Sequence, residues 1–328
     1  MSDEALFHRK NGKPEEAPAP LAPLADTHGH LTHFRKTTAA EAIVRAALVG
    51  VRMTVVPVDP VDEVGPGMRF ETPAAFLSWL DETVDGAAAR LGELAGEGLV
   101  PPAFPGWEGV PDLVDNVRIV AGAHPYGAPQ LDAAALARLD ELLDSPRCVG
   151  VGEIGLDFGP WSKLPADVQE PAFRTQLRVA HERGLPVELH LRDEEDGVHY
   201  TGHDIALRVL QEEGVPAAGC DLHCFTSNPE VMAPFVELGC HIAFGGAVTF
   251  AGNQAIRDAA AACLEHLLLS ETDSPYMAPV PLRGTECEPA MVAFSAACVA
   301  DVREEAGVAM RSQTYASLWE NACGLLGR

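Results

Sequence analysis

Three adjoining stretches of the sequence decide the fold: CVGVGE at 148–153, VQEPAFRTQLRVAHER at 168–183 and LPVELH at 185–190. The first and third are short and almost continuously apolar, which is typical of parallel strands buried on both faces of a sheet. The middle stretch carries apolar residues at helical spacing. A strand, a helix and a second strand in this order predict a βαβ unit.

The same alternation runs through most of the chain. Six more apolar runs bring the number of predicted strands to eight, and they lie at 21–27, 51–58, 117–123, 218–223, 240–245 and 266–273. Further helical patterns lie between them, at 38–49, 72–96, 131–143, 203–213, 229–238 and 253–263. Eight strands alternating with helices favour a closed α/β barrel of the TIM type, (β/α)₈, over an open sheet. A chain of 328 residues suits one such domain.

Three segments depart from this rhythm. Residues 1–24 are rich in Pro, Ala and charge and have no periodic apolar face, so we expect a flexible N-terminal arm before a single domain at 25–328. Residues 59–116 are too long for one loop and one helix, which predicts an insertion after the second strand, at the end where loops build sites. Residues 286–326 carry two helical patterns, the last barrel helix and an extra C-terminal helix.

Composition and charge limit the partners. The formal net charge of −25 opposes stable binding of a nucleic-acid duplex, because phosphate neutralisation usually supplies much of that affinity. A strand end or a small anionic substrate is easier to accept, because bound cations can make a local anion site. No stretch approaches the ~20 apolar residues of a membrane span, and we expect no membrane partner. Eight scattered cysteines without a C-x-x-C pair, and no signal peptide, indicate a reduced cytoplasmic protein.

Ligand-type residues gather at one place in the predicted barrel. Side chains at the C-terminal ends of barrel strands line the active site, and buried ionisable groups there need partners such as metal ions. Six residues hold this position and are the predicted metal ligands: His28, His30, Glu153, His190, His223 and Asp273.

The motif DTHGH at 26–30 shows the chemistry most directly. His28 and His30 stand two apart on a strand, so both imidazoles project from the same face and could bind one cation. Two hydrogen-bonded core histidines would give the same pattern. Asp26 shares their face and is a candidate to support a ligand imidazole, and His33 lies one turn further on.

The remaining candidates have assigned roles in hydrolysis. Glu153 follows a buried run and stands between glycines, and its two carboxylate oxygens could bridge two cations. Asp273 could bind one metal and take a proton from the attacking water. We expect substrate contacts from His124, Arg192 and Tyr276, although Arg192 could pair with an acidic neighbour and His124 could be structural.

In order along the chain, DTHGHL at 26–31, GAHPY at 122–126, GEIGLDF at 152–158, HLRD at 190–193, HCFTSN at 223–228 and ETDSPY at 271–276 resemble the TatD-type metal-dependent hydrolases, a branch of the amidohydrolase-like barrels. The resemblance implies one metal on His28, His30 and Asp273. It implies a second on His190 and His223, with Glu153 bridging the two. It also implies DNase or 3′-exonuclease activity. Gly29, Tyr126 and Leu191 depart from the family pattern without removing a ligand.

These observations predict a two-metal hydrolase that acts on nucleic-acid ends through a water shared by the two ions. Imidazole and carboxylate donors suit Zn, Mn, Fe, Ni or Mg. The alternative keeps the metals and cleaves a small ester, lactone or amide, because the fold does not fix the substrate. A non-catalytic metal-binding barrel is the third hypothesis.

Overall fold

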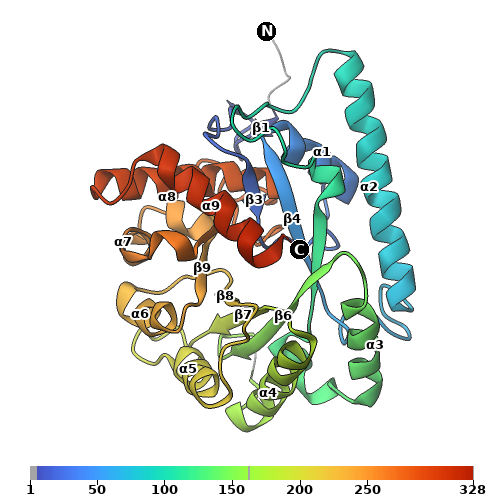
Figure 1. The fold of residues 1–328 in the computed structure, drawn as a ribbon, viewed down its shortest axis with the longest axis vertical. Coiled ribbons are helices and arrows are strands. Elements are labelled where there is room, and N and C mark those ends of the chain that lie inside the picture. The colour runs from blue at the N-terminus through green and yellow to red at the C-terminus, as the bar shows by residue number, and fades with distance from the viewer. Residues whose placement is uncertain (1–5, 162, 328) are drawn as a thin grey trace.

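The computed structural model describes residues 6–161 and 163–327 and contains the predicted barrel (Figure 1). Its main sheet has eight strands in the order of the chain, and every neighbouring pair in the ladder is parallel. The strands are β3 (Leu24–Asp26), β4 (Val51–Val58), β5 (Val117–Ala121), β6 (Cys148–Asp157), β7 (Val187–Arg192), β8 (Cys220–Leu222), β9 (His241–Phe244) and β10 (Leu268–Ser270). Each of the eight predicted runs contains or overlaps one of them, which confirms the fold class.

The sheet closes where its first strand meets its last. The backbone N–H of Thr27 donates to the carbonyl of Ser270 at 3.2 Å, and the Ser270 hydroxyl donates to the carbonyl of Ala25 at 3.1 Å. Gly29 and Ser274 form a parallel bridge just above. We call this junction of β3 and β10 the seam of the barrel.

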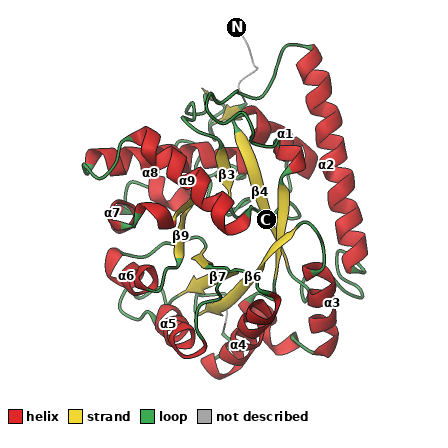
Figure 2. Cartoon of the chain, in the orientation of Figure 1, coloured by secondary structure: helices red, strands yellow, loops and turns green. Residues whose placement is uncertain are grey.

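Helices surround the sheet (Figure 2). The ring comprises α1 (Ala39–Leu48), α2 (Pro73–Gly96), α3 (Ala133–Leu143), α4 (Ala166–Arg183), α5 (Thr201–Glu213), α6 (Pro229–Glu237), α7 (Gln254–Ala262) and α8 (Val292–Glu305). Sequence sets where several begin: the hydroxyls of Thr38 and Thr72 accept from backbone N–H groups in the first turns of α1 and α2. Short 3₁₀ turns occupy Leu113–Asp115, Pro125–Gln130, Gly246–Thr249, Glu265–Leu267 and Pro289–Met291.

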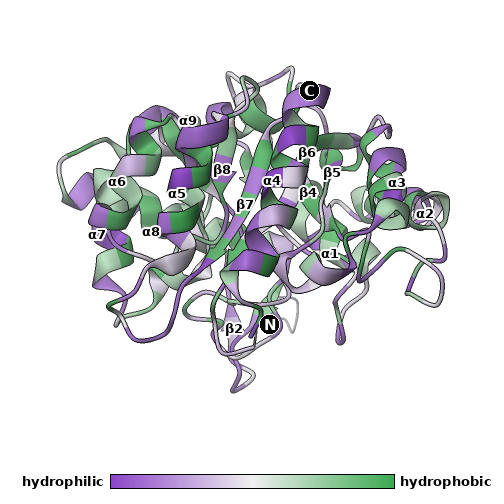
Figure 3. Ribbon diagram, turned by 90° about the horizontal axis from the view of Figure 1, so that it is seen from below, coloured by the Kyte–Doolittle hydropathy of each residue, from purple (hydrophilic) through white to green (hydrophobic). Residues whose placement is uncertain are grey.

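The extra C-terminal helix α9 (Arg311–Leu326) covers the end of the barrel where the strands begin. Its Trp319 and Leu325 join one apolar cluster with Met53 and Val120, which come from β4 and β5. In Figure 3 the strands at the centre are largely hydrophobic, whereas the surrounding helices carry many hydrophilic residues. The opposite end, where the strands finish, is the end at which α/β barrels carry their active sites.

The N-terminal segment packs against the barrel from Leu6 onward, which its composition did not indicate. Two short antiparallel strands, β1 (Phe7–His8) and β2 (Pro14–Glu15), form a hairpin. The Phe7 ring is buried, lies edge-on to Phe294 at 5.5 Å and has the Arg45 guanidinium over its face. The buried Phe7 ring therefore anchors the segment. The overall composition of residues 1–24 does not reveal this single aromatic contact.

The predicted insertion at 59–116 is divided between the two ends of the barrel. Residues 59–72 form the loop above β4, and α2 then runs along one side of the molecule as the second barrel helix (Figure 1). The Pro/Gly-rich part returns to the opposite end, where Trp107 packs against the cluster under α9. Arg52 fixes it there by donating to the carbonyl of Pro102 at 2.8 Å.

All eight cysteines are free thiols. Among the described residues, no helix combines the length and the apolar character required to cross a bilayer. The cytoplasmic location stays a prediction.

Candidate metal centre

The structure brings all six predicted ligands together at the C-terminal end of the barrel. They come from five strands or the residues just after them: His28 and His30 after β3, Glu153 on β6, His190 on β7, His223 after β8 and Asp273 after β10. All six side chains are buried or nearly so, with at most 17% exposed.

Two histidines and an aspartate form what we call the first donor set. The Nε2 atoms of His28 and His30 lie 3.3 Å apart. Oδ1 of Asp273 lies 3.9 Å from the first nitrogen and 3.8 Å from the second. Donors bound at about 2.1 Å in a tetrahedral site stand roughly 3.5 Å from one another, so this set has room for one cation. It is one of three residue groups in the described chain whose donor atoms could hold an ion.

The second donor set is His190 and His223, whose Nδ1 and Nε2 atoms lie 3.1 Å apart. Oε1 of Glu153 approaches these nitrogens to 3.0 and 3.2 Å. Its other oxygen, Oε2, points to the first donor set, 3.8 Å from Nε2 of His28 and 3.6 Å from that of His30. The single carboxylate therefore stands between the two sets, one oxygen toward each.

Electrostatics favours the ligand forms of two of the donors, His28 and Glu153. Burial lowers the pKa of His28 well below its usual value, and the neighbouring His223 lowers it further. Burial alone would raise the pKa of Glu153, but hydrogen bonds from His190 and His223 outweigh it and hold that pKa well below the usual range. A neutral imidazole and an ionised carboxylate are the ligand forms of these groups. For His190, burial lowers the pKa, but hydrogen bonds with Asp157 and Glu153 outweigh burial and raise the pKa to about 9, so a cation must displace a proton there. The residue types and the spacing of the two donor sets fit divalent metal ions.

Comparison with known proteins agrees with this geometry. The family model for TatD-related DNases matches residues 25–327. The chain belongs to this family. A metal-dependent hydrolase from Escherichia coli K12, YcfH, is 38% identical over 198 residues, which cover 59% of this chain and 70% of that protein. The hydrolase YabD of Bacillus subtilis is 34% identical over 190 residues, covering 58% and 71%. As a TatD-family member, the protein is a metal-dependent hydrolase.

Two further comparisons bear on substrate and fold. A protein from Escherichia fergusonii named 3′-5′ ssDNA/RNA exonuclease TatD is 35% identical over 160 residues, covering 48% of this chain and 58% of that one. The crystal structure of YJJV, a TatD homologue from Escherichia coli K12, superposes with a TM-score of 0.68 at 24% identity. It covers 93% of this chain and 98% of that one, which shows the shared TatD-family fold.

Two buried carboxylates contact the ring nitrogens of His28 and His190 that point away from the other predicted ligands of this TatD-family protein. Oε1 of Glu188 lies 2.9 Å from Nδ1 of His28, and Oδ2 of Asp157 lies 2.9 Å from Nε2 of His190. A metal-binding histidine usually donates its other N–H to such a partner, which fixes the tautomer and the ring orientation. Sequence reasoning missed both. The signal for Glu188 was its position two residues before His190 on the same strand, which places both side chains on one face.

Asp26 and Glu271 accept hydrogen bonds from groups other than the imidazoles. Asp26 accepts hydrogen bonds from the N–H and the hydroxyl of Thr272, at 2.7 and 2.9 Å. We predicted that Asp26 supports a ligand imidazole, but within the described chain its side chain makes no hydrogen bond to one. Nδ1 of His28 lies next to Glu188 instead. Glu271 accepts from the N–H of Cys224 at 2.6 Å and so fixes the chain just after His223.

Glycines let the strands approach closely around the centre. A Cβ on Gly152 would lie 2.6 Å from Cβ of Glu188, and one on Gly155 would collide with the carbonyl of His190. Gly155 also has a φ of +144°, which side chains rarely allow. Between the two first-set histidines, a Cβ on Gly29 would lie 2.8 Å from both Asp26 Oδ2 and Ser274 Oγ.

The three predicted substrate contacts surround the centre at different depths. Nε2 of His124 lies 3.9 Å from Oε1 of Glu153, while its Nδ1 accepts from the N–H of Tyr126 at 3.2 Å. His124 thus both faces the centre and caps the following turn. Tyr276 is 52% exposed and packs edge-on to His30 at 6.0 Å. His124 therefore lies beside Glu153, and Tyr276 lies beside the first donor set.

Arg192 does not pair with its acidic neighbours in the sequence. Its Nη1 lies 3.8 Å from Oδ2 of Asp157, and its guanidinium stacks on Trp161. The neighbouring Asp193 instead accepts from His203, with Nδ1 and Oδ2 2.6 Å apart. The Arg192 side chain, 42% exposed, is therefore available beside the second donor set.

The loop above β4 forms the wall next to the first donor set. Its Glu63 accepts from the Thr32 hydroxyl at 2.5 Å and lies 3.3 Å from Nε2 of His33. The His33 ring in turn stacks on His30 with centroids 4.7 Å apart. Glu63 is a second residue that the sequence did not reveal, because it lies in an irregular loop without a motif.

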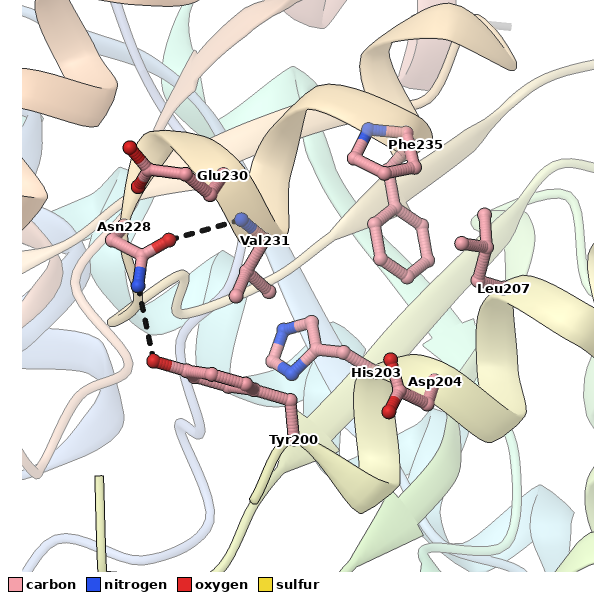
Figure 4. Close-up of a pocket in the computed structure, with 9 residues that line it drawn as sticks. Tyr200, His203, Asp204, Leu207, Asn228, Glu230, Val231 and Phe235 are labelled. Carbon is pink, nitrogen blue, oxygen red and sulfur yellow. Dashed lines mark hydrogen bonds between the residues drawn. The ribbon is translucent and has the colours of Figure 1, made fainter. Parts of the chain in front are cut away.

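A separate groove of about 500 Å³ lies between α5 and α6 (Figure 4). Across it, Asn228 Nδ2 donates to the hydroxyl of Tyr200 at 3.1 Å, and Oδ1 of the same amide accepts from the N–H of Val231. None of the six predicted ligands lines this groove.

Proposed function

We propose that this TatD-family protein uses two divalent metal ions to hydrolyse phosphodiester bonds at the ends of single-stranded nucleic acid, from the 3′ end. The observation that carries the proposal is the division of the Glu153 carboxylate between the two donor sets, 3.0–3.8 Å from its histidine neighbours. With one oxygen toward each donor set, Glu153 would help to hold two divalent ions.

The chain supplies the remaining parts of the reaction. When bound, divalent ions of the Zn, Mn, Fe, Ni or Mg type lower the pKa of water and stabilise charge on a phosphoryl oxygen. Asp273 orients the attacking water and accepts its proton. With 17% of its side chain exposed, this carboxylate can return the proton to solvent. His124, Arg192 and Tyr276 bind the phosphate and its sugar.

Two observations support nucleic-acid ends as the substrate. A relative covering about half of this chain carries the name 3′-5′ ssDNA/RNA exonuclease. The net charge of −25 disfavours a long duplex, which attracts proteins through many phosphates at once. A single strand that enters a local cationic pocket requires fewer such contacts.

The test uses the purified full chain loaded with Mg²⁺ or Mn²⁺ and a single-stranded oligonucleotide labelled at its 5′ end. We expect products shortened one nucleotide at a time, and no products from Glu153→Ala. Metal content is measured on the same samples. Absence of cleavage with every divalent ion, in protein that carries two ions per chain, would overturn the proposal.

A small ester, lactone or amide is the second candidate substrate. The charge of −25 supports it, because a neutral small molecule does not meet the repulsion that a polyanion does. A panel of small esters and lactones, assayed beside the oligonucleotide with the same metal-loaded protein, separates the two. A kcat/KM for any panel member well above that for the oligonucleotide would favour this candidate.

A further inference from the structure

The most exposed aromatic side chain on the loops above the strands is not one of the predicted site residues. Trp161, in the loop that connects β6 to α4, is 71% exposed. Exposed tryptophans are uncommon in folded proteins, because a large apolar ring remains in contact with water. This one is nevertheless held in place, since the Arg192 guanidinium carbon lies 4.8 Å from the ring centroid.

The geometry of the loop makes this stacking possible. A Cβ at Gly159 would collide with the side chain of Arg192, so glycine lets the arginine lie across the loop. The backbone adds a further link, because the N–H of Phe158 donates to the carbonyl of Arg192 at 2.8 Å. The Trp161–Arg192 pair is therefore fixed from two neighbouring strands, β6 and β7.

The pair is connected to the metal centre through one carboxylate. Arg192 lies 3.8 Å from Asp157, and the same carboxylate oxygen lies 2.9 Å from His190 of the second donor set. Tyr126 joins this group: burial and the nearby Asp157 raise the pKa of its phenol to about 12, and the residue is 37% exposed. An indole ring, a guanidinium and a phenol thus stand together beside the second donor set.

This combination matches one class of partner. Bases of single strands stack on aromatic rings, and arginine adds a cation–π contact and binds phosphate. With a net charge of −25, diffuse attraction of a polyanion is weak here, so stacking must contribute a larger share of the affinity. A base inside a duplex already has stacking partners on both faces and cannot use such a platform.

We infer that Trp161, backed by Arg192, is a stacking platform for an unpaired nucleobase next to the scissile phosphate. It selects base-bearing single strands over duplexes and over substrates without a base. This inference rests on the proposed nuclease function and adds the residue that recognises the base.

The first test compares two single strands with the metal-loaded protein: a normal oligonucleotide and one whose last three 3′ residues carry a tetrahydrofuran in place of the base. We expect wild type to prefer the normal strand in kcat/KM by roughly 5- to 100-fold, the range of base–aromatic stacking. The preference should largely vanish in Trp161→Ala and largely persist in Trp161→Phe. An unchanged preference in Trp161→Ala would overturn the inference.

The second test does not depend on cleavage. Binding of a short oligothymidylate should quench tryptophan fluorescence in wild type and shield it from acrylamide. Trp161→Phe should lose most of this response, whereas the control Trp107→Phe, altered at the opposite end of the barrel, should keep it. Equal responses in both variants would refute stacking on Trp161. If wild type cleaves neither strand while the fluorescence response holds, the nuclease proposal fails and the platform stands.

Discussion

Nδ1 of His28 lies 2.9 Å from Oε1 of Glu188, and both side chains are fully enclosed. Because Glu188 contacts Nδ1, Nε2 of the same imidazole can face His30 and Asp273, the other members of the first donor set. Burial and the nearby Asp221 raise the pKa of Glu188 well above its usual value. Because a metal-binding histidine usually donates its other N–H to such a partner, we expect the orientation of His28 to depend on Glu188.

Replacing this carboxylate should weaken metal binding. We expect Glu188→Ala to lower the affinity of the first donor set by roughly 10- to 100-fold, because His28 loses the partner that fixes its tautomer. Glu188→Gln keeps an acceptor at the same place and should lose less. Titration with Mn²⁺ or Zn²⁺ against a competing chelator measures both. Wild-type affinity in both variants would contradict the assignment.

Asp273 should matter more for turnover than for assembly of the second donor set. In Asp273→Asn the proton acceptor is lost, and we expect kcat to fall about 10²- to 10⁴-fold. His190 and His223 are untouched, so at least one ion per chain should remain. Steady-state kinetics and metal analysis on one preparation test both statements. The exposed Asp85→Asn in α2 is the matched control and should behave as wild type.

Gly29 should resist even a methyl group. In Gly29→Ala the new Cβ would meet the side-chain oxygens of Asp26 and Ser274 at 2.8 Å, so these two buried side chains must move next to the first-set histidines. We expect a lower melting temperature and weaker metal binding. The double variant Gly29→Ala/Ser274→Ala removes one of the two collisions and should recover part of both losses. Ala tolerated at no cost would show that the seam is softer than the structure indicates.

An ion-pair cluster between α4 and α5 should make stability depend on acid pH. Hydrogen bonds from Arg178 and Arg174 lower the pKa of Glu213 to about 2, against an ordinary value of 4.5. Because the folded pKa is depressed, this carboxylate contributes stability above its unfolded pKa, and the contribution disappears as the pH falls toward 2.

Glu213→Gln should therefore narrow the stability difference between pH 6 and pH 3, as measured by urea unfolding. The control is Glu82→Gln, at an exposed position where the carboxylate accepts a hydrogen bond from the Ser78 hydroxyl. Parallel pH profiles for wild type and Glu213→Gln would show that the cluster adds nothing measurable, as is common for surface pairs.

The sequence was most informative where apolar runs end in ligand-type residues. The predicted strand at 51–58 matches β4 at both ends, and the six predicted ligands meet at one end of the barrel. Both follow from local rules, because parallel strands in a barrel all finish at the same end. The observed distances among His28, Glu153 and His190 could not be predicted, since they depend on how the strands stagger.

What the sequence missed lies in contacts between distant segments. Glu63 contacts His33, beside the first donor set, from an irregular loop, and Trp161 stacks on Arg192 of the next strand. The return of Trp107 to the far end of the barrel depends on packing under α9. None of these has a local pattern, because each is set by which surfaces remain to be covered once the barrel has closed.

The seam has a consequence for how the protein unfolds. His28 and Asp273 stand on opposite sides of it, and they are separated by most of the chain. An ion bound by both residues would connect the first strand of the barrel to the last. Because the ion binds the folded site and not the unfolded chain, removing it should lower the free energy of unfolding. Occupancy of the centre should therefore be readable from the melting temperature alone, before any substrate is added.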